Sequence, residues 1–248
     1  MDAILAWEAE TPQWLEVLAA SRGERLSAAL STHILWRIYG PLMGRAFVTG
    51  QMGQSLDGRI ATATGHSHYI NGPAALVHLH RLRALVDAVV VGVGTVMADD
   101  PQLTVRRVKG AQPARVIVDP NGRAPAGARC FADDGARRIV LTRAAAKTPP
   151  GIERIELADF APAAMVAVLR AAGLARLLVE GGAMTLSKFL EAGALDRLHI
   201  MTGPMIIGSG KPGLALPEIA TLADALRPAT ATYVLPGGDI LTDCDLRG

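Results

Sequence analysis

The chain has 248 residues, of which 50% are hydrophobic and 19% are charged, so it can bury a sizeable core. Its net charge of +2 argues against a general nucleic-acid binder, which normally carries a large basic excess. No apolar run reaches the roughly 18 residues of a membrane span, and the first residues lack the pattern of a signal peptide. We therefore expect a cytoplasmic protein that binds neither nucleic acid nor membranes.

The cysteines and histidines give no sign of a metal site. Cys130 and Cys244 are the only cysteines, they lie far apart, and neither has Cys or His neighbours at ligand spacing. The histidine pairs likewise lack carboxylate or cysteine partners at such a spacing. We expect two reduced thiols and no metal.

Residues 1–40 differ from the rest of the chain because they contain all three tryptophans, Trp7, Trp14 and Trp36. Thr11 followed by Pro12 is typical of a helix start, with Thr as the N-cap and Pro in the first turn. We expect residues 1–40 to form a helical arm that packs on the main domain, residues 41–248, or on a second subunit.

From residue 46 onward, apolar runs of strand length alternate with helical stretches. This alternation predicts an α/β fold with a mixed, mostly parallel sheet and helices on both faces. Near the end, three expected strands follow one another without a helix, and Pro236-Gly237-Gly238 predicts the turn of an antiparallel hairpin. The expected strands are 46–51, 88–93, 115–119, 138–142, 152–157, 176–180, 198–202, 230–235 and 239–242, and the expected helices are 72–85, 162–172 and 183–191.

Three of the expected strands end in segments of small residues. Residues 52–61 contain an Asp-Gly pair, residues 92–106 begin with Gly-Val-Gly-Thr, and residues 177–186 contain Glu-Gly-Gly. Such strand ends bind ligands in open parallel sheets, and free N–H groups at helix starts favour phosphates. Each segment alone also fits an ordinary turn, and Met97 occupies the third glycine position of a GxGxxG motif. Together they predict one crevice for a dinucleotide and a phosphorylated substrate.

Five motifs in chain order resemble the reductase family of riboflavin biosynthesis: SLDGRIA, S-x-Y-I, H-x-LRA, GVGTVMADDPQLTVR and VEGGAMTL. The resemblance extends from about residue 46 to the last residue. It implies a dihydrofolate-reductase-like fold, a homodimer, and NADPH-dependent reduction of the ribosyl group of 5-amino-6-(5-phosphoribosylamino)uracil. In bacteria this reductase is often joined to a deaminase, whose H-x-E and P-C-x-x-C motifs are absent from this sequence.

The resemblance also implies site residues. The positions that match cofactor contacts of the family are Gly53, Arg59, Ile60, Ala61, Tyr69, Thr95, Asp99, Gly181, Gly182, Ala183, Met184, Thr185 and Leu186. The positions that match substrate contacts are Ser67, Arg83, Leu103, Arg106 and Glu180. The two arginines suit a 5′-phosphate, and the carboxylate suits donors on the pyrimidine.

Two positions depart from the family pattern. Tyr69 stands where relatives usually have Trp, and Pro120 stands where many have a hydroxyl residue near the adenosine phosphate. Because proline offers no side-chain donor, we expect preference for NADPH to come from Thr142, Arg143 or Arg123.

The resemblance implies that the cofactor supplies the hydride, so the protein mostly orients the reactants. Asp57 or Asp99 is then our candidate for assisting the proton, directly or through water. Two alternatives stay open: a reductase of another pteridine- or pyrimidine-like substrate, and a non-catalytic dinucleotide-binding protein of the same fold. Arg83 and Arg106 favour a phosphorylated substrate over folate.

Overall fold

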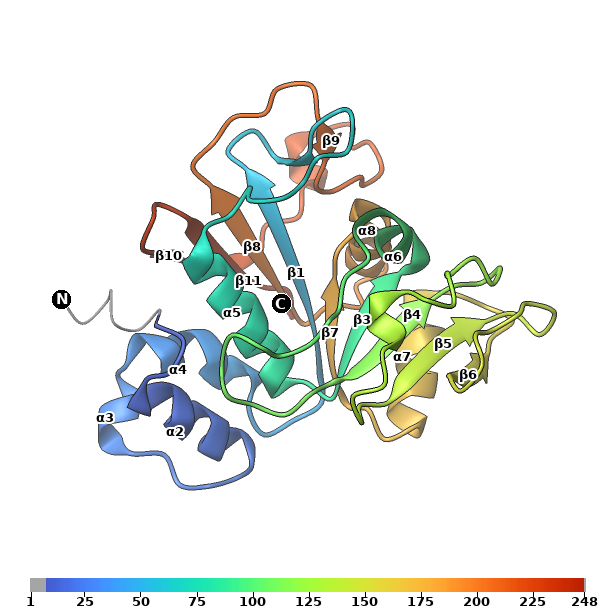
Figure 1. Cartoon of the computed structure of the whole chain (residues 1–248). Helices are drawn as coiled ribbons and strands as arrows, with labels where there is room; N and C mark the ends of the chain where they lie inside the picture. Colours follow the sequence, from blue (N-terminus) through green and yellow to red (C-terminus); the bar gives the residue numbers. More distant parts are fainter. Residues whose placement is uncertain (1–7, 248) are drawn as a thin grey trace.

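The alternating pattern folds into one large sheet of order β10-β11-β8-β1-β7-β3-β4-β5-β6 in the computed structural model, which describes residues 8–247 (Figure 1). Strands β1 and β3 to β8 run parallel, and β11 pairs antiparallel with both β8 and β10. The predicted mostly parallel sheet with a carboxyl-terminal hairpin is therefore confirmed. The strands are β1 (Phe47–Ser55), β3 (Ala88–Gly92), β4 (Ala114–Val118), β5 (Arg138–Thr142), β6 (Glu153–Glu156), β7 (Arg176–Glu180), β8 (Arg197–Gly203), β10 (Ala229–Val234) and β11 (Ile240–Asp245).

Helices cover both faces of the sheet, and alternate strand residues supply two cores. In β3, Val89 and Val91 point to the face covered by α5, while Val90 points to the face covered by α7 and α8. This is the period of two that a strand buried on both faces requires. The helices are α2 (Pro12–Ser21), α3 (Ala28–Ser31), α4 (Ile34–Tyr39), α5 (Pro73–Leu85), α6 (Val93–Asp99), α7 (Pro162–Ala171) and α8 (Ala183–Glu191), with the 3-10 turns η1 (Gly40–Leu42), η2 (Arg129–Phe131) and η3 (Leu222–Asp224).

The amino-terminal helices pack beside α5 and share its core (Figure 1). Thr11 is the N-cap of α2, as predicted, and its side chain accepts from the backbone N–H of Trp14. Trp14 is fully buried, and its indole N–H donates to the carbonyl oxygen of Lys109 at 3.0 Å. The sequence did not indicate α3 and α4, and Trp7 lies outside the described residues.

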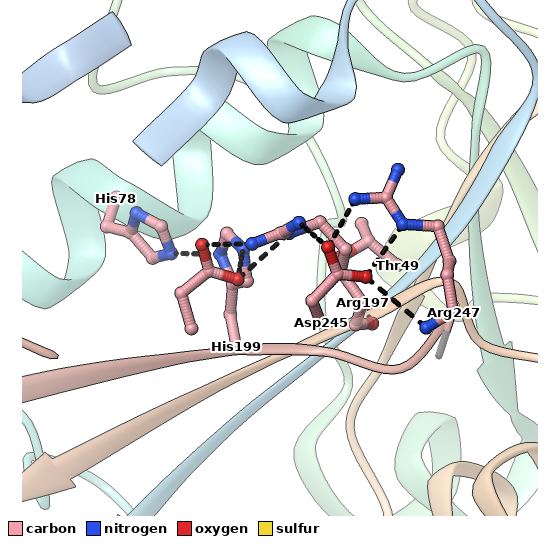
Figure 2. Close-up of polar contacts among 7 residues, drawn as sticks. Thr49, His78, Arg197, His199, Asp245 and Arg247 are labelled. Carbon is pink, nitrogen blue, oxygen red and sulfur yellow. Dashed lines mark hydrogen bonds and ion pairs between the residues drawn. The ribbon is translucent and has the colours of Figure 1, made fainter. Parts of the chain in front are cut away.

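A buried polar network ties these helices to the carboxyl-terminal strands. The Tyr39 hydroxyl lies 2.8 Å from Nδ1 of His78, whose Nε2 lies 3.1 Å from Nδ1 of His199. Asp243 on β11 accepts two hydrogen bonds from Arg197 on β8, and Figure 2 shows His78, His199 and Arg197 side by side. Burial, followed by the charge of His199 and nearby Arg81, holds the pKa of His78 well below its ordinary value.

Two features of the fold differ from the sequence expectation. β1 continues past residue 51 to Ser55, because β8 pairs with it from Thr49 to Ser55 despite the polar residues there. A separate pair, β2 (Arg59–Ala61) with β9 (Lys211–Pro212), was not expected. These strands are too short to leave a periodic signal, and their pairing depends on a partner some 150 residues away.

Candidate active site

A cavity of about 780 Å³ opens at the carboxyl ends of β3, β4, β5 and β7, between the starts of α6 and α8. This is the edge at which parallel α/β sheets bind ligands. Nine of the positions expected to contact cofactor line it: Ile60, Ala61, Thr95, Asp99, Arg143, Gly182, Ala183, Met184 and Thr185.

Close contacts between two glycine-bearing strand ends form the floor of this cavity. The N–H of Gly182 donates to Oγ1 of Thr95 at 3.0 Å. Gly181 has φ +72, and a Cβ there would lie 2.8 Å from Cγ2 of Thr95. A Cβ on Gly92 would lie 2.5 Å from Oγ1 of Thr185. The two strand ends therefore meet at this cavity, and glycine is needed at these positions because threonine side chains pack directly against the backbone.

Six expected cofactor positions do not line the cavity: Gly53, Arg59, Tyr69, Thr142, Gly181 and Leu186. The side chain of Asn71 packs against Gly53, and a Cβ at Gly53 would lie only 2.1 Å from Oδ1 of Asn71. Leu186 and Thr142 are fully buried behind the wall, and the side chain of Arg59 donates to the carbonyl oxygen of Gly208.

Tyr69 and Gly181 are the remaining two. Tyr69 is 86% exposed, and its ring centroid lies 6.2 Å from that of His68, which lines a second, smaller cavity. Gly181 contributes through its positive φ, which turns the chain from β7 toward α8.

Two arginines line the part of the cavity next to the carboxyl ends of β4 and β5: Arg123 and Arg143. Arg143 donates to Oδ1 of Asn121 at 2.7 Å, and its guanidinium lies 5.4 Å from the ring centroid of Phe160. Arg123 and Pro120 line the same cavity. These contacts hold Arg143 in place beside the space where a ligand would lie.

The lining residues that sequence reasoning missed include two aromatic or amide side chains, Phe160 and Asn121, and two lysines, Lys188 and Lys211. Lys188 lies one helical turn after Thr185 on α8, so helical spacing from the glycine-rich start could have found it. Lys211 belongs to the unexpected strand β9, and no sequence signal placed it here.

A second cavity of about 280 Å³ adjoins the first, and Ser67 and Asp99 line both. It brings together four of the five expected substrate positions: Ser67, Arg83, Leu103 and Arg106. Asp99, Asp100, Pro101, Gln102, His68 and Arg129 complete its lining. Sequence reasoning missed Arg129, which follows β4 and begins the 3-10 turn η2 in a segment without a motif.

Glu180, the fifth expected substrate position, is engaged with Arg83. Nε of Arg83 donates to one carboxylate oxygen at 2.7 Å, and Nη2 donates to the other at 2.6 Å. The two side chains are only 7% and 6% exposed. Glu180 lines neither cavity, so its carboxylate reaches substrate only through Arg83 in this arrangement.

The smaller cavity has an unusual backbone on one side. Asp100 has φ +38 and Leu103 has φ +58, and neither is glycine. Such conformations cost roughly 1–3 kcal/mol each and persist where neighbouring structure imposes them, often at binding sites. Asp100 caps the carboxyl end of α6, and the turn places Leu103 under the cavity.

The two candidate aspartates differ in their surroundings. Asp57 accepts from the hydroxyl of Ser55 and from the backbone N–H groups of Ile207 and Gly208. These bonds, the one from Ser55 first, lower the pKa of Asp57 to about 2, and Asp57 lines neither cavity. Asp99 lies where the cavities join, so the geometry favours Asp99 for a proton step.

His80, on α5, is hydrogen-bonded to the backbone of Arg106, which lines the smaller cavity. Its Nδ1 lies 3.1 Å from the backbone nitrogen of Arg106 and accepts that N–H. Burial, followed by the charges of Arg83, Arg106 and Arg107, lowers the pKa of His80 to about 3. The ring is therefore neutral at physiological pH, with its own proton on Nε2.

Within residues 8–247, no group of three or more His, Cys, Asp or Glu side chains could hold a metal ion. None of the helices in the described part of the chain is both long and apolar enough to cross a bilayer.

The molecule is thus an α/β protein with a mostly parallel sheet and two adjoining cavities at its carboxyl edge, one extended and one lined by arginines. Residues 46–228 match the family model of the RibD C-terminal domain. The chain therefore belongs to this family, as its motifs predicted.

Known relatives support the assignment. The chain is 34% identical over 224 residues to the 2,5-diamino-6-ribosylamino-4(3H)-pyrimidinone 5′-phosphate reductase of Methanothermobacter thermautotrophicus, covering 82% of this chain and 100% of that protein. It is 37% identical over 172 residues to the riboflavin biosynthesis protein RibD of Aquifex aeolicus, covering 67% of this chain but 48% of that protein. The chain thus spans about half the length of RibD relatives.

Solved structures agree with this fold. The deaminase/5-amino-6-(5-phosphoribosylamino)uracil reductase of Thermotoga maritima superposes with a TM-score of 0.70 at 30% identity. The superposition covers 81% of this chain and 56% of that one.

Proposed function

We propose that this protein is an NADPH-dependent reductase of a phosphorylated pyrimidine ribosylamine, either 5-amino-6-(5-phosphoribosylamino)uracil or its 2,5-diamino-pyrimidinone counterpart. One observation carries the proposal: an extended cavity adjoins a smaller arginine-lined one, and Ser67 and Asp99 line both. Two ligands bound in this way would meet at the shared wall, as hydride transfer requires.

The larger cavity suits a nicotinamide dinucleotide. One part of its wall is formed by the N-termini of α6 and α8. The N–H groups at a helix N-terminus favour phosphate oxygens. Arg143, held by Asn121 and Phe160, together with Arg123, supports a preference for the extra phosphate of NADPH. Replacing either arginine by Gln is expected to weaken NADPH binding about tenfold or more, since a charge-assisted contact is lost, and to leave NADH binding unchanged.

The reduced cofactor, when bound, supplies a hydride to C1′ of the opened sugar. The protein holds the two ligands in contact and excludes water with Leu103 and the walls of α6 and α8. Asp99 lies at the junction and is our candidate for handling the proton. We expect Asp99→Asn to lower kcat. We expect Asp57→Asn to leave kcat unchanged, because the Asp57 carboxylate accepts hydrogen bonds from the backbone of Ile207 and Gly208 and lines neither cavity.

The test is NADPH oxidation measured with each of the two phosphorylated pyrimidines and with dihydrofolate. Turnover of either pyrimidine, without turnover of dihydrofolate, supports the proposal. NADPH binding without turnover of either pyrimidine would point to another pteridine- or pyrimidine-like substrate. Failure to bind any nicotinamide dinucleotide would overturn the reading of the chain as an enzyme.

We propose in addition that the protein is a homodimer in the cytoplasm. Exposed apolar side chains between β8 and β10 support an interface there, because such side chains are usually covered in the assembled protein. They are Met205, Ile206, Leu216, Ile219, Leu222 and Leu226. Two buried cysteines without a disulfide suit a reducing compartment. Light scattering coupled to gel filtration tests the oligomeric state.

A further inference from the structure

The three arginines that line the smaller cavity differ in whether they have an acidic partner. Arg83 forms a bidentate ion pair with Glu180, so this pair brings no net charge. Arg106 and Arg129 line the same cavity, and within residues 8–247 neither has a carboxylate within ion-pair distance. Asp99 and Asp100 also line this cavity, so what sets Arg106 and Arg129 apart is that, among the described residues, their guanidinium groups have no carboxylate partner.

Arg129 is held in place by its backbone. Its N–H donates to Oδ1 of Asp100 at 2.8 Å, and its neighbours Ala128 and Cys130 are buried. Asp100 is itself fixed as the left-handed cap of α6. The 3-10 turn η2 thus holds the backbone of Arg129 at a defined place beside the cavity.

Arg106 is fixed from the other side. His80 accepts the backbone N–H of Arg106, and Nη1 of Arg106 donates to the Thr104 hydroxyl at 3.2 Å. The charge of Arg129 is one of the causes that lower the pKa of Arg106, after burial, Arg83 and Arg107. Both guanidiniums line the same cavity, so they repel each other there, and a dianion between them would offset that repulsion.

We propose that Arg129 is a phosphate-binding residue that, with Arg106, makes this enzyme select substrates carrying a terminal phosphomonoester. The inference rests on the proposed function, because it assigns the phosphate of that substrate to this cavity. It differs from the sequence expectation, in which Arg83 and Arg106 share the phosphate. Arg83 is already committed to Glu180, whereas Arg129 is free to bind.

The test compares Arg129→Gln with Arg107→Gln. Arg107 is the matched control because it is an exposed arginine next to Arg106 that lines neither cavity. We expect Arg129→Gln to raise KM for the phosphorylated pyrimidine about tenfold to a hundredfold, as loss of hydrogen bonds to a charged group does. We expect kcat, KM for NADPH and KM for the dephosphorylated substrate to stay within about twofold. Arg129→Lys, which keeps the charge, should recover part of the loss.

Equal effects of Arg129→Gln and Arg107→Gln would overturn the inference. So would a loss that is as large for the dephosphorylated substrate, since the residue would then not act on the phosphate. A raised KM for NADPH instead would assign Arg129 to a cofactor phosphate and also overturn it.

A second measurement separates this inference from the proposed function. Ribose 5-phosphate is expected to raise the Tm of the wild type and of Arg107→Gln, but not of Arg129→Gln, whereas ribose has no effect on any of them. If neither pyrimidine is turned over while this pattern holds, the proposed function fails and the phosphate site stands. If turnover occurs but ribose 5-phosphate stabilises Arg129→Gln as it does the wild type, the phosphate site fails.

Discussion

The Arg83–Glu180 pair allows a stability prediction with a magnitude. The two charges form hydrogen bonds of 2.7 and 2.6 Å while only 7% and 6% exposed, so water barely screens them. Removing one partner leaves the other charge buried and unpaired, which costs about 3–5 kcal/mol. Since a domain is stable by only about 5–15 kcal/mol, either Arg83→Met or Glu180→Leu should come close to unfolding the protein.

The assay is urea denaturation of the two single variants and of the double variant, followed by circular dichroism. We expect the midpoint to fall strongly in each single variant at an unchanged m value. The double variant should lose much less than the two losses added together, because no unpaired charge remains; a coupling of about 2 kcal/mol or more is expected. Single losses below about 1 kcal/mol, or losses that simply add, would refute this account of the pair.

Three further predictions concern pH, a helix start and a glycine. Because the pKa of His80 falls from 6.5 to about 3 on folding, the unfolded chain binds the proton more tightly between these values. Stability should therefore drop as pH falls from 6.5 towards 3, by up to about 1.4 kcal/mol per pH unit, and His80→Asn should flatten the drop in thermal melts. Asp239, 1% exposed, accepts from the backbone N–H of Gly72 at the start of α5, so Asp239→Ala should cost about 1–3 kcal/mol in urea; an unchanged midpoint would contradict this. Gly92→Ala should destabilise the protein by about 1–3 kcal/mol through its contact with Thr185, while Gly94→Ala, with open space around it, should not; equal effects would contradict the packing argument.

Much of the fold could be predicted because the relevant physics is local. The run Val89–Val90–Val91 is a strand buried on both faces, and glycine after it marks the turn into α6. β5, β7 and α8 occur at the expected bounds, since apolar runs with sharp polar or glycine boundaries specify them. The hydrogen bond between Gly182 and Thr95 joins the ends of two strands. Their proximity could be predicted because the carboxyl ends of parallel strands lie at one edge of the sheet.

The rest of the site depends on distant parts of the chain. Glu180 was expected to face substrate, but its partner is Arg83, 97 residues away, and only the folded chain brings them together. Gly53 was expected to line the cofactor site, yet its lack of a side chain makes room for Asn71. Arg129 begins the three-residue 3-10 turn η2, which is too short for a periodic pattern, so the local sequence does not indicate that Arg129 faces a cavity.

The buried network of Tyr39, His78, His199 and Asp243 joins parts of the chain on either side of the segment that matches the family. The family match covers residues 46–228, which omits both Tyr39 at one end and Asp243 at the other. Both side chains are at most 1% exposed and are joined through the two histidines. The interior of this chain is therefore closed by side chains that lie outside the matched segment at both ends. We expect amide protons of α2, α5 and β11 to exchange together, as parts of one cooperative unit.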